Sequence, residues 1–528
     1  METPFLRLAE LCDSLEKISR SSEKIELVSK FLSTLNESEL EPAVFLIIGT
    51  AFAETDPQTL GIKWGLISKM QIDSKQTTLF QKSLSIRAIH SYFSKLAQIS
   101  GEGARKKKKR LLETLFQEAS PIEQKFIMRN IMGEMRHGVA EGIMVKAIAK
   151  AAKVNDALIK KLNAIHGNLG DLARIAITQG INGLKNIKLT PFTPIQPMLA
   201  DSIDSLDELF KNTPPEIACE YKYDGIRVQI HKQNNEIRLF SRQLKDITSS
   251  FPEIVNIFLK SISNQSAIFD GEIVAIGAED RPLPFQELMR RFRRIHETQR
   301  AQQEVIVKVY LFDILFLDDT LLFDNPYQDR WDLLSKTCRN LTLATRIVSN
   351  DKATISQFFQ DAMAAGHEGL LIKYLQSHYY PGERKNYWLK LKEAVLLDLL
   401  IIAADWGSGR RYGWLSNYHL AAFDPKTGTF HEIGKTFKGL TDEEFKLMTQ
   451  TLQAIKTHET QYTVYVKPQI IVEVAFNEIQ KSPQYPSGYA LRFARIKRVR
   501  PDKIPTETTT IQEIAQLYER QFDKKART

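Results

Sequence analysis

Cysteine and long apolar runs are both scarce in this chain of 528 residues. Its three cysteines, Cys12, Cys219 and Cys338, lie far apart and form no C-x-x-C pair. They therefore suggest neither a zinc site nor a disulfide framework, and they fit a reducing compartment. Apolar stretches such as AVFLIIGTAFA (43–53) are too short to cross a bilayer, and the acid-containing N-terminus does not resemble a signal peptide. We expect a soluble, intracellular protein.

Internal repeats, low-complexity segments and a G-x-x-x-x-G-K-[ST] phosphate loop are also missing, and the last absence argues against a P-loop ATPase. The composition is that of an ordinary globular protein, with 43% hydrophobic and 26% charged residues. The formal net charge of +9 suits a polyanionic partner, either nucleic acid or an anionic membrane surface. At ~100–200 residues per domain, the length predicts two to four domains.

Residues 1–190 are expected to form an all-α domain. Apolar residues recur there at three- and four-residue spacing, as in IEQKFIMRNIMGEM (122–135). The proline-rich segment NIKLTPFTPIQPMLA (186–200) breaks this pattern and predicts an interdomain linker.

A basic run stands out in the helical region. SGEGARKKKKR (100–110) places glycines before six consecutive basic residues. One interpretation is a solvated, charged helix start. The other, which the glycines favour, is a flexible loop and a cationic turn that meet a nucleic-acid backbone. We therefore predict nucleic-acid contacts from Arg105, Lys106, Lys107 and Lys108.

The pattern of apolar and polar residues changes beyond the linker. IACEYKYDGIRVQIHK (217–232), SAIFDGEIVAIG (266–277) and VIVKVYLFDILFL (305–317) are strand-like, with helical segments between them. They predict an α+β domain over 191–393. Residues 394–528 contain several short strands, one internal helix and a closing helix, which predict a small β-barrel such as an OB-fold.

EYKYDGIRVQI (220–230) puts an ammonium group, that of Lys222, between two tyrosines in a strand-like segment. An unpaired buried charge is costly, so Lys222 should be paired or functional. A lysine becomes a nucleophile only after losing its proton, and we expect desolvation and nearby cations to lower its pKa. A lone K-x-D-G is usually a surface turn. Here it is followed by SR (241–242), FDGE (269–272), LFD (311–313), EGLLIK (368–373), WLKLK (388–392) and LRFARIKRVRPDK (491–503).

In this order and spacing, the motifs resemble those of the covalent nucleotidyltransferases, which include ATP-dependent DNA ligases, RNA ligases and messenger-RNA capping enzymes. EYKYDGIR is similar to the nucleophile motif of the ATP-dependent DNA ligases of archaeal and eukaryotic type. LGIKWGLI (60–67), IMGEMRHGVAEGIMVKAIAKA (131–151), PFTPIQPMLA (191–200) and ADWGSGRRYGWLSNYHLAAFDP (404–425) are also similar to that family. The resemblance covers nearly the whole chain. It implies a helical DNA-binding domain, a nucleotidyltransferase (adenylation) domain and an OB-fold domain, in that order.

The resemblance implies a DNA ligase that uses ATP and Mg²⁺, with Mn²⁺ able to substitute. Lys222 would attack the α-phosphate of ATP, release pyrophosphate and hold AMP. AMP would pass to the 5′-phosphate at a nick in duplex DNA, and the 3′-hydroxyl would then displace it. Such phosphoryl chemistry depends on positioning and charge neutralisation. The expected setting is DNA replication, repair and recombination.

The same resemblance implies a role for each motif residue. Glu220 would read the adenine amino group through its side chain or backbone, and Phe312 would stack on the base, although it also suits an ordinary core. Glu272 would hold the ribose hydroxyls or a metal-bound water, and Glu368 would hold magnesium. Contacts with ATP or other phosphates are expected from Arg227, Arg242, Arg384, Lys390 and Lys392.

The basic residues at the end of the barrel allow two interpretations. After domain closure, Arg492, Arg498 and Lys503 would orient the departing pyrophosphate. The same segment, taken as one strand, could instead be a basic DNA-binding face. Further DNA contacts are expected from Arg136 and Arg290.

Two other functional classes compete with DNA ligation. An RNA ligase or guanylyltransferase would not show the helical N-terminal region, and a non-catalytic OB-fold binding protein would not need the full set of motifs. NAD-dependent ligases carry a four-cysteine zinc module, which three scattered cysteines cannot build. We expect a cytoplasmic monomer, nucleoid-associated if prokaryotic, with no membrane partner. QKSLSI (81–86) lies where archaeal relatives carry a sliding-clamp peptide, but it lacks the aromatic pair, so a helix start is the alternative.

Overall fold

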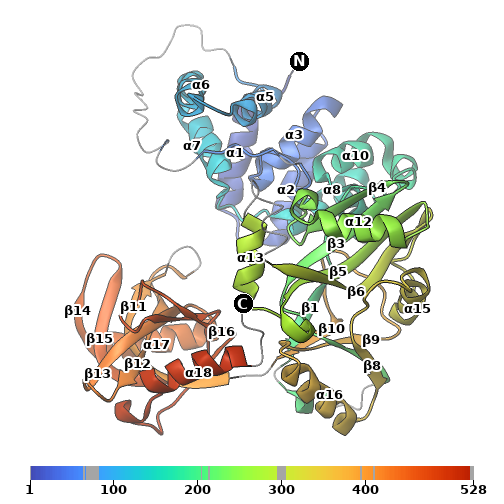
Figure 1. Cartoon of the computed structure of the whole chain (residues 1–528). Helices are drawn as coiled ribbons and strands as arrows, with labels where there is room; N and C mark the ends of the chain where they lie inside the picture. The colour runs from blue at the N-terminus through green and yellow to red at the C-terminus, as the bar shows by residue number, and fades with distance from the viewer. Residues whose placement is uncertain are drawn as a thin grey trace.

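The chain forms a helical N-terminal part, a central part built on two sheets and a strand-rich C-terminal part (Figure 1). The structure is a computed structural model that describes residues 2–56, 58–62, 66, 83–203, 205–211, 215–293, 305–392, 395–407 and 411–523. The helical and central parts lie against each other, and the C-terminal part forms a separate lobe (Figure 1). The predicted fold class is confirmed, although strand pairing among the described residues does not close the C-terminal sheet into a complete barrel.

The helical part follows the predicted periodicity. Leu, Ile and Phe side chains on one face of each helix are buried together in a single large cluster. Asn36 with Glu39, and Ser120 with Glu123, form capping boxes that define where two of the helices begin. The helices are α1 (Phe5–Glu16), α2 (Ser21–Leu32), α3 (Glu37–Ile48), α5 (Ile86–Gln98), α6 (Ala104–Glu118), α7 (Pro121–Met132), α8 (Glu141–Ala152), α9 (Asp156–His166) and α10 (Leu169–Lys185).

The basic run belongs to a helix and not to a loop. Helix α6 begins at Ala104, directly after Gly103, whose φ of 72° suits the turn. Residues 105–107 are exposed, but Lys108 turns inward and donates to the carbonyl oxygen of Leu60 at 2.5 Å. Lys108 therefore does not lie among the exposed cations of this run, and a contact with DNA would require it to leave Leu60. Helical periodicity turns every third or fourth residue of such a run toward the domain.

The linker is held by side chains of a central strand. The N–H of Ile195 donates to Oε1 of Gln229 at 2.9 Å, and the N–H of Phe192 donates to Nδ1 of His231 at 3.2 Å. These contacts satisfy the linker's backbone groups where it forms no regular structure.

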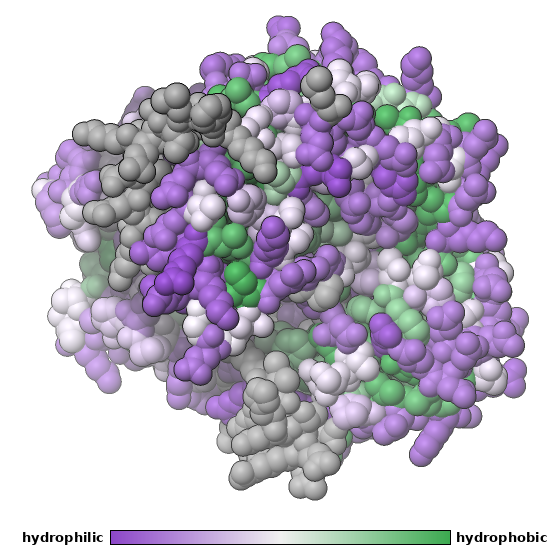
Figure 2. Space-filling model, turned by 90° about the horizontal axis from the view of Figure 1, so that it is seen from above, coloured by the Kyte–Doolittle hydropathy of each residue, from purple (hydrophilic) through white to green (hydrophobic). Residues whose placement is uncertain are grey.

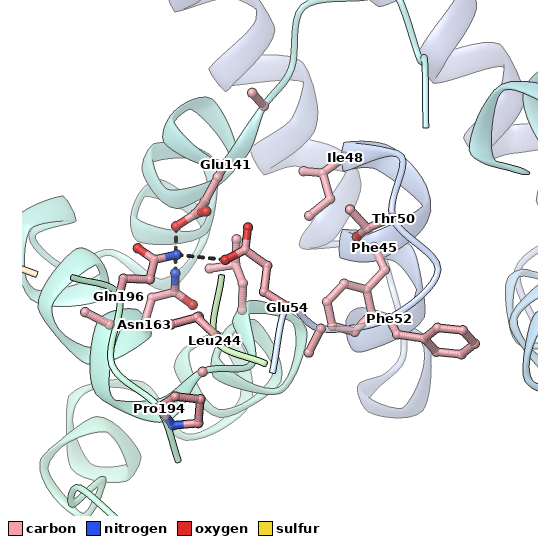
Figure 3. A pocket seen from close by; sticks show the side chains of 15 residues that line it. Phe45, Ile48, Thr50, Phe52, Glu54, Glu141, Asn163, Pro194, Gln196 and Leu244 are labelled. Carbon is pink, nitrogen blue, oxygen red and sulfur yellow. Dashed lines mark hydrogen bonds between the residues drawn. The ribbon is translucent and has the colours of Figure 1, made fainter. Parts of the chain in front are cut away.

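A cavity of about 190 Å³ lies where the linker meets the helical part. Glu54 and Glu141 point toward the amide of Gln196 across it (Figure 3), and the amide donates to Glu54 at 3.2 Å. Its lining contains the apolar side chains of Phe45 and Leu244 but none of the residues predicted to contact ATP. The cavity therefore marks the domain junction and is distinct from the predicted nucleotide site.

The central part contains two five-stranded sheets. The first has the order β1 (Leu199–Ile203), β10 (Arg384–Lys392), β9 (Gly369–Tyr374), β2 (Ile217–Tyr221), β8 (Arg346–Ser349). The second has the order β4 (Glu236–Ser241), β3 (Ile226–Gln233), β5 (Ser266–Ile276), β6 (Ile306–Leu317), β7 (Thr320–Leu321). Because β2 and β3 belong to different sheets, the four residues between them pass from one sheet to the other.

Helices cover the outer faces of both sheets. Apolar side chains of α11 (Leu206–Leu209) and α16 (Lys352–Ala364) pack with the first sheet. Those of α12 (Pro252–Ser261), α13 (Phe285–Arg293) and α15 (Tyr327–Thr337) pack with the second. The opposite face of β5 carries Asp270 and Glu272 together with the apolar Ile268 and Val274.

The C-terminal part contains one six-stranded sheet and a hairpin. The sheet has the order β13 (Thr429–Thr436), β12 (Leu415–Asp424), β11 (Val395–Trp406), β15 (Thr463–Phe476), β14 (Lys456–Glu459), with β18 (Arg495–Val499) also paired to β15. The hairpin joins β16 (Glu478–Lys481) to β17 (Tyr489–Arg492), and the helices are α17 (Asp442–Ala454) and α18 (Ile511–Asp523). The basic segment was predicted as one strand, but Phe493, with a φ of 55°, separates β17 from β18.

The face of the molecule seen from above is mainly polar. From above, hydrophilic residues dominate the visible face, and hydrophobic residues show only in small patches among them (Figure 2). Every helix in the described ranges is too short or too polar to cross a membrane.

Candidate active site

Lys222 lies in the segment that crosses from the first sheet to the second. Its N–H donates to the carbonyl oxygen of Gly369 at 2.9 Å, and its carbonyl oxygen accepts from the N–H of Glu368 at 3.0 Å. A Cβ on Gly225 would lie 2.1 Å from the carbonyl oxygen of Ile273, so only glycine lets the crossing segment approach β5 this closely. The backbone thus fixes the predicted nucleophile between the sheets.

The ammonium of Lys222 binds the carboxylate of Glu368. The same carboxylate oxygen, Oε2, accepts from the ammonium of Lys392 at 2.8 Å. Burial works against the charge on Glu368, but the two lysines outweigh it and hold the pKa of Glu368 well below its usual range. The site therefore contains a carboxylate that is charged at neutral pH and shared by two ammonium groups.

The pKa of Lys222 differs from the sequence-based expectation. Burial acts to lower it, as predicted, but the carboxylate of Glu368, with smaller contributions from Glu272 and Asp224, outweighs burial, and the net pKa is raised. The expected lowering is therefore wrong. Of the neighbouring cations that we expected to lower it, Lys392 is paired with Glu368, Arg227 with Asp270 and Lys373 with Glu220.

Four of the predicted phosphate-contacting cations, Arg242, Arg384, Lys390 and Lys392, lie near enough for the charges of the others to act on Lys390. Burial lowers the pKa of Lys390, and the positive charges of Arg384, Lys222, Lys392 and Arg242 lower it further. Since β10 alternates inward and outward side chains, Lys390 and Lys392 share a face, as expected. These positive charges repel one another, and binding several anionic oxygens at once would offset that repulsion.

Glu272 lies opposite Arg227 in the pairing of β5 with β3. Burial raises the pKa of Glu272 to about 8, although the charges of Lys222 and Arg227 act in the opposite direction. Glu272 is therefore protonated over much of the neutral range and has a hydroxyl to donate. The structure thus places it beside the nucleophile as a neutral acid.

The guanidinium of Arg227 is already occupied. It donates to Asp270 through Nε at 3.1 Å and through Nη2 at 2.7 Å, and it donates to the carbonyl oxygen of Met198 at 2.6 Å. The ring of Phe312 lies 5.6 Å from the guanidinium carbon. The structure therefore places Arg227 in an ion pair, and the predicted phosphate contact would require a rearrangement. Phe312 is buried in the core cluster, where its ring also lies 4.6 Å from the ammonium of Lys373.

Glu220 forms a fully buried group with Lys373 and Tyr327. The ammonium of Lys373 lies 2.8 Å from Oε2 of Glu220, and the hydroxyl of Tyr327 donates to Oε1. Burial raises the pKa of Glu220 and lowers that of Lys373, while their contact favours the charged pair. Both carboxylate oxygens are engaged, and β2 is paired with β9 and β8 at Glu220, so the predicted contact of Glu220 with an adenine would require a rearrangement.

The remaining predicted contacts lie at the surface. Arg492 is 3.4 Å from Glu478, Arg498 is 2.9 Å from Glu473, and Lys503 is 2.6 Å from Asp398, so each cation is paired with an acid of its own C-terminal part. The structure therefore does not bring these three cations to Lys222.

Two predicted DNA contacts are exposed ion-pair partners. Arg136 is 3.2 Å from Glu134, and Arg290 is 2.8 Å from Glu287. The first two residues of the clamp-like segment, 81–82, lie outside the described residues.

Sequence reasoning missed several polar residues between the sheets. Asp270 receives Arg227 and also accepts from the hydroxyl of Tyr379 at 2.9 Å. Asp270 precedes Glu272 by two positions on β5, and strand alternation could have placed it on the same face. Tyr327 and Tyr379 gave no such signal, since they come from a helix and a loop far along the chain.

Comparisons with known proteins agree over almost the whole chain. The family model described as "ATP dependent DNA ligase domain" matches residues 197–392. "DNA ligase N terminus" matches 4–74 and 69–149, and "ATP dependent DNA ligase C terminal region" matches 411–503. A DNA ligase of Thermococcus onnurineus is 36% identical over 99% of both chains.

Further relatives extend this likeness. DNA ligase 1 of Korarchaeum cryptofilum is 36% identical over 98% of both chains. A solved structure named Pmar-Lig_PreS3 shares the fold, with a TM-score of 0.62 and 18% identity, over 93% of this chain and 99% of that chain. With a lysine held among cations and carboxylates between two sheets, and with full-length relatives above 30% identity, this chain belongs to the ATP-dependent DNA ligases.

Proposed function

We infer that this protein seals nicks in duplex DNA through a lysine-bound AMP intermediate. The observation that carries this function is the position of Lys222, which lies beside Glu368 and faces a group of cations on β10. Those cations suit the α-, β- and γ-phosphates of ATP. A covalent intermediate then divides a difficult displacement into easier steps.

In the first step, a bond forms between Nζ of Lys222 and the α-phosphorus. The bond from that phosphorus to the bridging oxygen breaks, and pyrophosphate leaves with the electron pair. Nζ, an ammonium at the start, gives up two protons to solvent and keeps one in the phosphoramidate. AMP then passes to the 5′-phosphate of the nick and restores Lys222. In the last step, the 3′-hydroxyl attacks the activated phosphate, loses its proton, and AMP departs.

The residues of the pocket have distinct tasks in this scheme. Lys390 and Lys392 neutralise charge on the phosphates, with Arg242 and Arg384 at the more exposed side. The neutral carboxyl group of Glu272 donates to the ribose hydroxyls. We propose that Glu220 contacts the base, which requires its carboxylate to give up part of its contact with Lys373 and Tyr327.

Magnesium fits the donor set around Lys222. Among the described residues, no group of three or more His, Cys, Asp or Glu side chains forms a metal site by itself. Mg²⁺ commonly uses only one or two carboxylates together with phosphate oxygens and water, and Glu368 is the residue that would hold it. When bound, the ion would neutralise charge on the phosphates during transfer. Mn²⁺ offers similar chemistry.

The DNA partner is proposed to contact exposed cations of the helical and central parts. Residues 105–107 of α6, Arg136 and Arg290 are exposed and suit phosphates. Arg492, Arg498 and Lys503 would reach the departing pyrophosphate only if the C-terminal lobe moved, a gating motion of the kind that completes many active sites. We propose that the protein is a cytoplasmic monomer. A sliding clamp is the remaining predicted partner, and a pull-down with the clamp tests it.

The test is labelling and sealing with matched variants. Wild-type protein is mixed with α-labelled ATP or GTP and then with a nicked DNA or nicked RNA duplex. We expect ATP-dependent labelling of the protein and sealing of DNA. The Lys222→Ala variant should lose both, and Lys260→Ala, an exposed lysine on α12, should retain both. Labelling by GTP without sealing of DNA would overturn the proposal.

A further inference from the structure

His367 lies beside the nucleophile and has no part in the chemistry described so far. Its ring centroid is 5.3 Å from that of Tyr221 and 4.8 Å from that of Tyr223, the two residues that flank Lys222. It also directly precedes Glu368. We propose that His367 is a positioning residue for adenylyl transfer: its ring, packed between the two tyrosines, holds Lys222 and Glu368 in register. This proposal rests on the function proposed above.

The two tyrosines are themselves anchored to opposite sides of the central part. Tyr221 packs against Phe358 of α16, with ring centroids 4.8 Å apart. Tyr223 stacks on Tyr310 of β6, with centroids 4.1 Å apart and an interplanar angle of 17°. His367 is thus the middle ring in a row of five that runs from a helix on the first sheet to a strand of the second.

This row of rings packs around residues 221–223, the same segment whose backbone is hydrogen-bonded to residues 368–369. Lys222 and residues 368–369 exchange two hydrogen bonds, of 2.9 Å and 3.0 Å. These bonds fix the backbones of the two segments but do not by themselves orient the side chains. Contacts from His367 to both tyrosines add lateral restraint on either side of Lys222. The carboxylate of Glu368 then meets the ammonium of Lys222 in one orientation.

Packing around His367 distinguishes a positioning role from a purely structural one. The side chain is half-buried, and it meets the apolar clusters through the rings of Tyr221 and Tyr223. Tyr223 is further held by its hydroxyl, which accepts from the N–H of Thr345 at 2.9 Å. Loss of the imidazole should therefore leave both cores intact and loosen only the geometry at Lys222.

The experiment separates the first chemical step from the last. Full-length His367→Ala and His367→Phe variants are compared with wild type in rapid-quench adenylylation by labelled ATP. We expect His367→Ala to slow the maximal rate by roughly tenfold or more, since small misplacement of reacting groups costs large factors, with KM for ATP changed less than about twofold. His367→Phe restores a flat ring and should recover to within about threefold of wild type.

Sealing of a nick that already carries 5′-AMP bypasses the attack by Lys222, and His367→Ala should retain it to within about threefold. Equal loss in both steps, or a His367→Phe variant as slow as His367→Ala, would overturn the positioning role, and so would a normal rate for His367→Ala. The matched control is His458→Ala, which removes a histidine stacked on Tyr465 at 4.2 Å on the C-terminal sheet and should adenylylate normally. If Lys222→Ala still forms the adenylate, the proposed function itself fails, which is a different result.

Discussion

The carboxylate of Glu368 binds Lys222, the nucleophile, through the same Oε2 oxygen that accepts from Lys392 at 2.8 Å. This shared oxygen keeps Lys222 in an ion pair and holds its side chain in place. Glu368, which we propose as the magnesium ligand, thus also keeps Lys222 in its charged, unreactive form. The arrangement makes Glu368 the residue whose loss should affect the pocket most after Lys222 itself.

Glu368→Gln keeps the size of the side chain and removes its charge. We expect adenylylation to slow by roughly 10²-fold, because electrostatic groups of this kind are often worth that much, and the Mg²⁺ concentration for half-maximal rate to rise. Rapid-quench labelling across a Mg²⁺ series measures both quantities. Unchanged metal dependence would show that Glu368 acts only on the lysine.

The buried pair of Lys373 and Glu220 should contribute strongly to stability. Lys373→Met leaves the carboxylate of Glu220 buried without its cation, which typically costs ~3–5 kcal/mol. The double variant Lys373→Met/Glu220→Gln removes both charges and should recover part of that loss. Denaturant unfolding followed by fluorescence gives the free energies of unfolding. A double variant that is less stable than the single one contradicts this assignment.

Stability should fall in mild acid because of His231. Burial lowers the pKa of His231 from 6.5 to about 3, so the folded protein keeps the ring neutral while the unfolded chain binds a proton. The stabilising contribution is fully present above pH 6.5 and is lost as the pH falls toward 3, at up to ~1.4 kcal/mol per pH unit. His231→Gln should flatten this dependence in unfolding measured at several pH values.

A second buried histidine gives an independent check. Burial lowers the pKa of His137, in the helical part, to about 4. His137→Gln should therefore flatten the acid dependence separately, and the double variant with His231→Gln should flatten it further. If the free energy of unfolding fell with acid as steeply in all three variants as in wild type, these histidines would be ruled out as the cause.

The basic residues of α6 should separate into two classes. Lys106→Ala and Lys107→Ala remove exposed cations, so each should weaken DNA binding and reduce the salt dependence of the binding constant by up to ~0.9 for each phosphate that is no longer neutralised. Lys108→Ala should leave the salt dependence unchanged and lower the midpoint of thermal unfolding, since its ammonium holds Leu60. Binding to a nicked duplex over a salt series distinguishes the two outcomes.

The order of helical, mixed and strand-rich regions was predictable because it depends on local periodicity. Segments such as IEQKFIMRNIMGEM (122–135) repeat apolar residues at helical spacing, and SAIFDGEIVAIG (266–277) carries the β-branched residues of a strand. The break at Phe493 was not predictable in this way, because an isolated positive φ leaves no periodic trace. The inward turn of Lys108 was missed for a related reason: six consecutive cations conceal which face of the helix is buried.

The sequence by itself determined the chemistry available to this protein: a lysine in a K-x-D-G motif, the acids and cations of the following motifs, and their order along the chain. Only the tertiary structure decided how those charges pair. Lys222 faces Glu368, Arg227 is held by Asp270, and Glu220 by Lys373. Electrostatic interaction depends on distance and burial in three dimensions, and neither quantity can be obtained from the spacing of residues along a chain.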